Sequence, residues 1–217
     1  MSIRILLADD HAIVRDGLSK SFQEQENMEI IGQAQDGLTT VELAREHSPD
    51  LIIMDIGMPD LNGIEATRQI LRDSPKVKII GLSMHSGKRF VTEMFKAGAK
   101  GYLPKDCEFE ELIDAIQAVM GGKMYLSPSI TDVVVDNYIR TSPGNQSSAF
   151  SVLTPREREV IQLMAEGNST KQIGLRLYIS PKTVEAHRLR IMKKLDIDNV
   201  AQLTKYAIQE GLTSPEP

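Results

Sequence analysis

The chain has 217 residues, of which 41% are hydrophobic and 25% are charged, and its net charge at pH 7 is −5. Its single cysteine, Cys107, excludes a disulfide framework and a cysteine-based metal site. No apolar run approaches the roughly 18 residues of a membrane span, and the first run stops too early for a signal peptide, so we expect a cytoplasmic protein without a membrane partner.

The first 120 residues or so alternate short apolar runs with helical patterns. The apolar runs are Ile3–Ala8, Glu29–Ala34, Leu51–Asp55, Val77–Ser83 and Gly101–Pro104. The helical patterns that follow them are Ala12–Gln25, Thr39–His47, Ile64–Asp73, Arg89–Ala97 and Glu108–Met120. Five strand-then-helix units predict an α/β fold, a doubly wound five-stranded parallel sheet.

Charged residues follow three of the predicted strands. Asp9 and Asp10 follow the first, Asp55 ends the third, and Lys105 follows the fifth. The carboxyl ends of parallel strands gather at one edge of a sheet, so we expect these side chains to meet there. Three carboxylates and an ammonium suit a hard divalent cation and a phosphoryl group. A plainer alternative is that Asp9 and Asp10 cap the helix that begins near Ala12.

A linker separates this half from the remainder. Residues 123–149 contain one short predicted helix, Ser129–Ile139, followed by a stretch rich in Pro, Gly, Ser and Asn that cannot bury apolar area. We therefore predict one domain over residues 1–122 and another over residues 150–217.

The C-terminal segment predicts an all-α domain of four short helices with clear N-caps. Thr154 and Ser169 each begin a capping box, Ser180 precedes Pro181, and Asn199 precedes the last helix. A short helix, a tight turn and a basic helix are the order of a helix-turn-helix, in which the later helix enters the major groove of DNA.

Charge is divided unevenly along the chain. Residues 1–150 carry 15 Lys and Arg against 22 Asp and Glu, whereas residues 151–217 carry 10 against 8. Residues 176–194, around the predicted basic helix, carry six basic residues and one acid, Glu185. Such a strip is often just a solvated face, but its position on the helix favours a polyanion as partner.

Both halves resemble known families. The N-terminal half resembles a flavodoxin-like response-regulator receiver domain, through the acidic pair, Asp55 with the motif Met58-Pro59-x-x-Asn62-Gly63, Ser83 and Lys105. The segments 153–160 and 180–187 resemble a LuxR-type DNA-binding domain. Together they resemble the FixJ/NarL class of two-component response regulators.

The resemblance implies a role for each receiver residue. Asp55 would accept a phosphoryl group from a sensor histidine kinase, and Lys105 would neutralise a phosphoryl oxygen. Ser83 would bond the phosphoryl group and Tyr102 would rotate toward the space that Ser83 leaves, although Tyr102 could also be a static core residue. The predicted Mg²⁺ ligands are Asp9 (through water), Asp10, Asp55 and the Gly57 carbonyl.

A helical wheel divides the basic helix into two faces. Val184, Ile191 and Leu195 should face the domain core. The residues that we predict to contact DNA are Lys182, Thr183, Glu185, Ala186, Arg188, Leu189, Arg190 and Lys193. The cations would contact phosphates, while Glu185, Ala186 and Leu189 would face base edges.

Some assignments on these helices stay open. Arg188 lies near the core direction of the wheel and could pair with Glu157 or Glu159 instead of DNA. His187 is more typical of a packing residue than of a base reader. In the last helix, the stripe Val200, Leu203, Thr204 and Ala207 could join two copies on a two-fold site or close the domain's own core, and we favour self-association.

These features predict a phosphorylation-dependent, DNA-binding transcription regulator that acts as a homodimer on a two-fold operator. It would not be an enzyme beyond Mg²⁺-dependent self-phosphorylation and slow dephosphorylation of Asp55. One rival is an aspartyl-phosphate hydrolase, which usually has a second aspartate two residues after the nucleophile, where this chain has Gly57. The other rival is a regulator that binds DNA regardless of phosphorylation.

Overall fold

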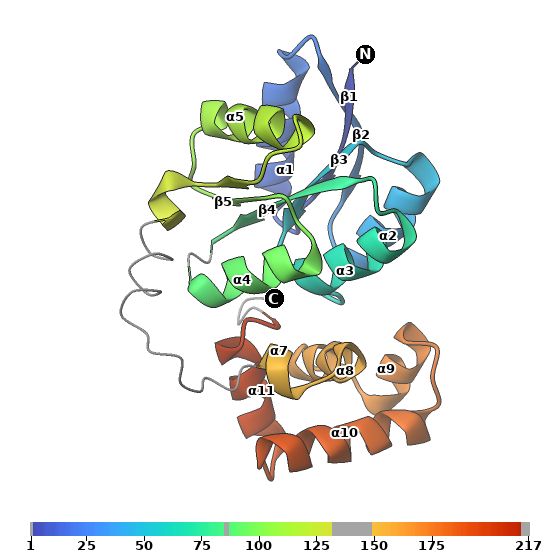
Figure 1. Ribbon diagram of the computed structural model, residues 1–217. Coiled ribbons are helices and arrows are strands. Elements are labelled where there is room, and N and C mark those ends of the chain that lie inside the picture. Colours follow the sequence, from blue (N-terminus) through green and yellow to red (C-terminus); the bar gives the residue numbers. More distant parts are fainter. Residues whose placement is uncertain (1, 85–86, 132–148, 214–217) are drawn as a thin grey trace. The chain divides into compact units, whose positions relative to one another are not determined.

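The computed structural model describes residues 2–84, 87–131 and 149–213 (Figure 1). The chain forms two compact units, residues 1–58 with 62–144 and residues 59–61 with 145–217, and each is described by itself. None of the helices in the described ranges is long and apolar enough to cross a membrane.

The N-terminal unit is built on a parallel sheet with the strand order β2-β1-β3-β4-β5-β6. The strands are β1 (Ile3–Ala8), β2 (Met28–Ala34), β3 (Leu51–Asp55), β4 (Lys78–Ser83), β5 (Gly101–Pro104) and β6 (Tyr125–Leu126). The first five confirm the predicted strands to within one residue at each end. The strand β6 was not predicted; it lies in the predicted linker and pairs with β5. With only two residues, β6 has no periodic pattern to detect.

Helices cover both faces of this sheet (Figure 1). They are α1 (Ala12–Gln23), α2 (Gly37–His47), α3 (Gly63–Asp73), α4 (Lys88–Ala97) and α5 (Phe109–Met120). Alternate strand residues such as Ile5 and Leu7 pack with Phe22 of α1 and Ile116 of α5 in one core. The helices α2, α3 and α4 pack in sequence on the opposite face. Because helices cover both faces of the sheet, β3 is buried at all five positions, and its first four residues are apolar.

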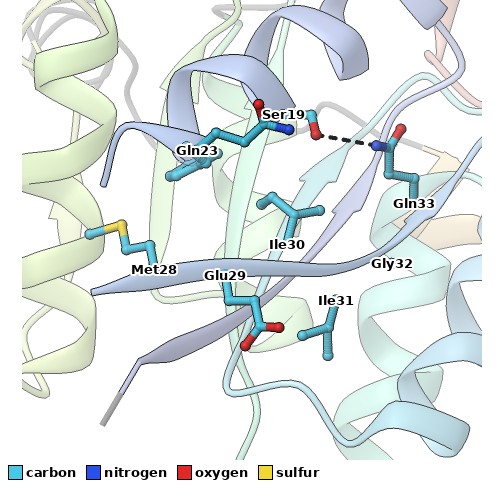
Figure 2. Close-up of a pocket in the computed structure, with 9 residues that line it drawn as sticks. Ser19, Gln23, Met28, Glu29, Ile30, Ile31, Gly32 and Gln33 are labelled. Atoms are coloured by element: carbon cyan, nitrogen blue, oxygen red, sulfur yellow. Dashed lines mark hydrogen bonds between the residues drawn. The ribbon is translucent and has the colours of Figure 1, made fainter. Parts of the chain in front are cut away.

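One edge of the sheet is irregular. Among the described residues, β2 pairs only with β1. The register shifts where Ile5 faces Ile30 but Leu6 faces Gly32, so that Ile31 is an extra residue. Beside this edge, a hollow opens between α1 and β2 (Figure 2). There the Gln33 amide donates to the Ser19 hydroxyl at 3.4 Å.

The C-terminal unit is all helical, with its own core. Its helices are α7 (Ala149–Val152), α8 (Pro155–Ala165), α9 (Thr170–Arg176), α10 (Pro181–Leu195) and α11 (Val200–Gln209). The predicted capping boxes form at Thr154 and Ser169, and Ser180 and Asn199 also cap as predicted. The four-residue α7 was not predicted. In the linker, residues 128–131 are helical, and the rest of the predicted helix lies outside the described residues.

Candidate functional sites

The acidic pocket forms where three strands end. Asp9 follows β1, Asp55 is the last residue of β3, and Lys105 follows β5. The Nζ atom of Lys105 lies 2.8 Å from Oδ2 of Asp9 and 2.8 Å from Oδ2 of Asp55, and each of the three side chains is only 5% exposed. The structure therefore brings together the charged residues that the strand-end argument selected.

Burial and charge act against each other in this pocket. Burial raises the pKa of the Asp55 carboxyl, and the nearby Lys105 ammonium opposes part of that rise. For Lys105, burial acts to lower the pKa, but the Asp55 and Asp9 carboxylates together outweigh it and the pKa is raised overall. The ammonium therefore stays charged, and Asp55 is a buried carboxyl whose negative charge depends on a cation beside it.

The pocket also gathers possible metal ligands. Oxygen or nitrogen atoms of Asp9, Asp10, His11 and Asp55 all lie within 4.8 Å of one another. Three carboxylates fit a hard cation such as Mg²⁺. The backbone N–H of Gly57 donates to Oδ1 of Asp55 at 3.2 Å, which places the Gly57 peptide beside the carboxylate.

Sequence reasoning missed His11. Its Nδ1 atom lies 2.7 Å from Oδ1 of Asp10 and 3.3 Å from Oδ1 of Asp9. Its position directly after the acidic pair was the available signal. His11 is the N-cap residue of α1, and no side chain caps that helix. Asp9 instead accepts the N–H of His11 at 2.8 Å, so the alternative in which the acids cap α1 is wrong.

Ser83 and Tyr102 lie behind the pocket on adjacent strands. Both are buried, and a hydrogen bond joins their side chains. Burial raises the pKa of Tyr102 to about 12, although the bond with Ser83 opposes the rise. A Cβ atom on Gly81 would lie 3.4 Å from the Tyr102 ring and 3.1 Å from Met94, so Gly81 leaves room for the ring. Tyr102 therefore occupies an inward position; its rotation stays a prediction.

The loop after β3 folds back onto Asp55. The N–H of Gly63 donates to the Ile56 carbonyl at 3.0 Å, and a Cβ atom on Gly63 would lie 2.0 Å from the Asp55 carbonyl oxygen. Asn62 caps α3 by accepting the N–H of Glu65. The structure thus explains why Asn62 and Gly63 occupy these positions: Asn62 caps α3, and Gly63 lets the helix begin directly against the Asp55 backbone.

The second candidate site is the surface of α10. Val184 and Ile191 are buried and Leu195 is partly buried, as the wheel predicts. Of the predicted DNA-contacting residues, Glu185, Ala186 and Arg188 are partly buried. The exposed ones are Lys182, Thr183, Leu189, Arg190 and Lys193.

Two residues of α10 have partners within the domain. Oε1 of Glu185 accepts the Thr170 hydroxyl of α9 at 2.8 Å, and Oε2 lies 3.4 Å from the Arg188 guanidinium. The alternative partners suggested for Arg188 were wrong. Glu157 pairs with Lys194 and Glu159 pairs with Arg156, both at 2.6 Å. A helical wheel gives the direction in which each side chain of α10 points, but it does not show which residues of other helices pair with it.

Two further assignments are settled by burial. His187 is partly buried, and burial followed by the charges of Arg190 and Arg156 lowers its pKa, which fits a packing residue. In α11, Leu203 and Ala207 lie in the domain's own core, so they cannot form a dimer stripe. Val200 is exposed, at 43%.

Two families match the chain. Residues 5–117 match the response regulator receiver domain, and residues 151–207 match the bacterial regulatory proteins of the luxR family. The chain belongs to the response regulators. Its domain combination is that of the NarL/FixJ class, whose members are two-component transcription regulators with a DNA-binding helix-turn-helix rather than conventional enzymes.

This response regulator is similar to curated and solved relatives over nearly its whole length. It is 36% identical to the transcriptional regulatory protein DegU of Brevibacillus brevis, over 96% of this chain and 94% of that protein. It is also 36% identical to the oxygen regulatory protein NreC of Staphylococcus carnosus, over 97% of this chain and 99% of that protein. A solved complex of the response regulator RcsB with DNA matches with a TM-score of 0.61 and 25% identity, over 97% of this chain and 99% of that chain.

Proposed function

We propose that Asp55 accepts a phosphoryl group from a sensor histidine kinase and that this changes dimerisation and DNA binding. The observation that carries the proposal is the ammonium of Lys105, which lies 2.8 Å from both Asp9 and Asp55 in a buried pocket. A carboxylate that is held next to a fixed cation can approach an anionic phosphoryl donor without full charge repulsion.

Each side chain then has a defined part in the reaction. An Asp55 carboxylate oxygen attacks the phosphorus atom, the bond between phosphorus and the donor atom breaks, and an acyl phosphate forms. Lys105 neutralises charge on the phosphoryl group. The Ser83 hydroxyl exchanges its bond with Tyr102 for one with a phosphoryl oxygen. Ser83 ends β4 and Tyr102 belongs to β5. The exchange therefore changes the contact between these two strands as well as the contacts inside the pocket.

The donor set fits Mg²⁺. Asp10 and Asp55 would bind the ion directly, Asp9 through water, and the Gly57 carbonyl would complete the protein ligands. When bound, the ion supplies positive charge that stabilises the phosphoryl oxygens during transfer. His11 lies among these residues but is not needed as a ligand of a cation that prefers oxygen.

The C-terminal domain would read DNA through α10. Lys182, Arg190 and Lys193 are exposed cations suited to phosphate contacts, and Leu189 is an exposed apolar residue suited to a thymine methyl group. Each domain covers one half-site, so we propose a homodimer on a two-fold operator. The solved RcsB–DNA complexes support DNA as the partner. We place the protein in the cytoplasm, where kinase and DNA are both accessible.

Labelling with acetyl phosphate and Mg²⁺ tests the proposal. Wild-type protein should take up one phosphoryl group, sediment as a dimer and bind its operator more tightly. Asp55→Asn should remain unlabelled and monomeric, because an amide is not a nucleophile. Asp10→Ala should label more slowly while staying folded. Stoichiometric labelling of the Asp55→Asn protein would show another acceptor, and unchanged DNA affinity after labelling would favour the phosphorylation-independent regulator.

A further inference from the structure

Several helices of this chain end in the same tight turn. A residue at the C-cap or directly after it takes a left-handed conformation, and the next N–H bonds back to the carbonyl five residues earlier, which defines a Schellman motif. Glycine occupies the left-handed position at Gly98, Gly122, Gly167 and Gly211. After α10 the position holds Asp196.

The turn after α9 is different, because a large aromatic residue occupies this position. The Ile179 N–H bonds to the Gly174 carbonyl at 2.9 Å, and Tyr178 has a φ of 54°. Glycine takes this conformation without steric cost, whereas a side chain strains it. Tyr178 is also 94% exposed, so burial of its ring does not offset the strain. Such an outlier points to a function outside the fold of the domain.

The position of Tyr178 relative to α10 is fixed by close packing. A Cβ atom on Gly174 would lie 2.8 Å from the Ile179 carbonyl oxygen, so α9 and the turn are in direct contact. Ser180 then caps α10 by accepting the N–H of Thr183. In a helix-turn-helix, the first residues of the recognition helix enter the major groove. A residue just before that helix therefore lies at the rim of the groove, where the phosphates are.

The sequence on either side of Tyr178 suits a polyanion as partner. Residues 170–183 contain three cations, Lys171, Arg176 and Lys182, and no acidic residue. A tyrosine among cations offers an apolar ring for a sugar and a hydroxyl that can donate to a phosphate oxygen.

We propose that Tyr178 is a further DNA-contacting residue, which packs its ring on a deoxyribose and donates its hydroxyl to a phosphate at the groove rim. The inference rests on the proposed binding of DNA by α10. The contact gives affinity that is independent of base sequence.

Stability and binding should change in opposite directions when Tyr178 is replaced. Tyr178→Gly should raise the Tm, because strain is relieved, and weaken binding to operator and random duplexes alike. Tyr178→Phe should lose about tenfold in affinity, the worth of one hydrogen bond to a charged group, with little change in Tm. The matched control is Ser48→Gly, which relieves a left-handed residue with a φ of 46° in the receiver and should leave DNA affinity unchanged.

A fluorescent variant reports the contact directly. The chain contains no tryptophan, so Tyr178→Trp provides a single probe. Its emission should be quenched freely by acrylamide in the free protein and protected in the presence of a random duplex. If Tyr178→Gly keeps wild-type affinity while Lys182→Ala loses it, the inference is wrong and the proposed function stands. If the emission were instead protected from acrylamide only when the protein concentration was raised, without DNA, Tyr178 would be assigned to contact with a second copy of the chain. A wild-type protein that binds no duplex would overturn both.

Discussion

Lys105 and Asp55 form a buried ion pair, with 2.8 Å between Nζ and Oδ2. Replacing Lys105 with methionine would leave Asp9 and Asp55 facing each other without a cation. We expect Lys105→Met to lower the free energy of unfolding at pH 7 by about 3 kcal/mol, as when one partner of a buried pair is removed. Lys100→Met, at an exposed lysine, is the control and should change stability little.

The pH dependence of that loss follows from the sign of the pKa shift. Burial already raises the pKa of Asp55, and removing Lys105 takes away the main opposing charge, so the pKa rises further. A carboxyl with a raised pKa binds its proton more tightly in the folded chain. The deficit of Lys105→Met should therefore shrink as the pH falls through the raised pKa toward the ordinary 3.8. Urea unfolding across this range would check it; a constant deficit would contradict the account.

Tyr102 should limit stability at alkaline pH. Its pKa is raised to about 12 in the folded chain, against 10.0 as the ordinary value. Between these values the unfolded chain loses the proton and the folded chain keeps it, so stability falls as the pH rises above 10. Tyr102→Phe should be less sensitive in this range than wild type. Equal alkaline sensitivity of the two proteins would show that Tyr102 is not the group responsible.

Gly63 and Gly17 should respond to alanine in opposite ways. A Cβ atom on Gly63 would lie 2.0 Å from the Asp55 carbonyl oxygen, whereas one on Gly17, inside α1, would meet nothing within 4 Å. We expect Gly63→Ala to destabilise the receiver strongly, by about 3 kcal/mol or more. Gly17→Ala should stabilise it by about 0.5–1 kcal/mol. Thermal unfolding of both variants measures the difference; a Gly63→Ala protein with wild-type Tm would refute the packing argument.

Lys193 and Leu189 should separate affinity from specificity on α10. Lys193→Ala removes an exposed cation and should lower the slope of log affinity against log salt by roughly one unit on any duplex. Leu189→Ala should change the preferred sequence, at about 1–3 kcal/mol for a lost base contact. Selection from random oligonucleotides distinguishes the two. If wild type and Leu189→Ala selected the same DNA motif, Leu189 would lie outside the groove.

The fold and the acidic pocket could be predicted because their signals are periodic or tied to strand ends. Asp9, Asp55 and Lys105 follow from the rule that parallel strands end at one edge. His11 could not be selected this way, since a single histidine after an acidic pair has no spacing rule. The bond between Glu185 and Thr170 could not be predicted, because the two residues lie on different helices and only the packed structure brings them together. Leu203 and Ala207 were ambiguous, since core and interface share one pattern.

The extra residue Ile31 in β2 has a consequence for the behaviour of concentrated protein. A regular edge strand is a template for strand pairing between molecules, and a bulge interrupts it. The opposite edge of the sheet is β6, which has only two residues. Neither edge offers a second molecule a long, even row of backbone groups. The protein should thus resist fibre-like aggregation, and two copies that associate have to use helix and loop surfaces instead.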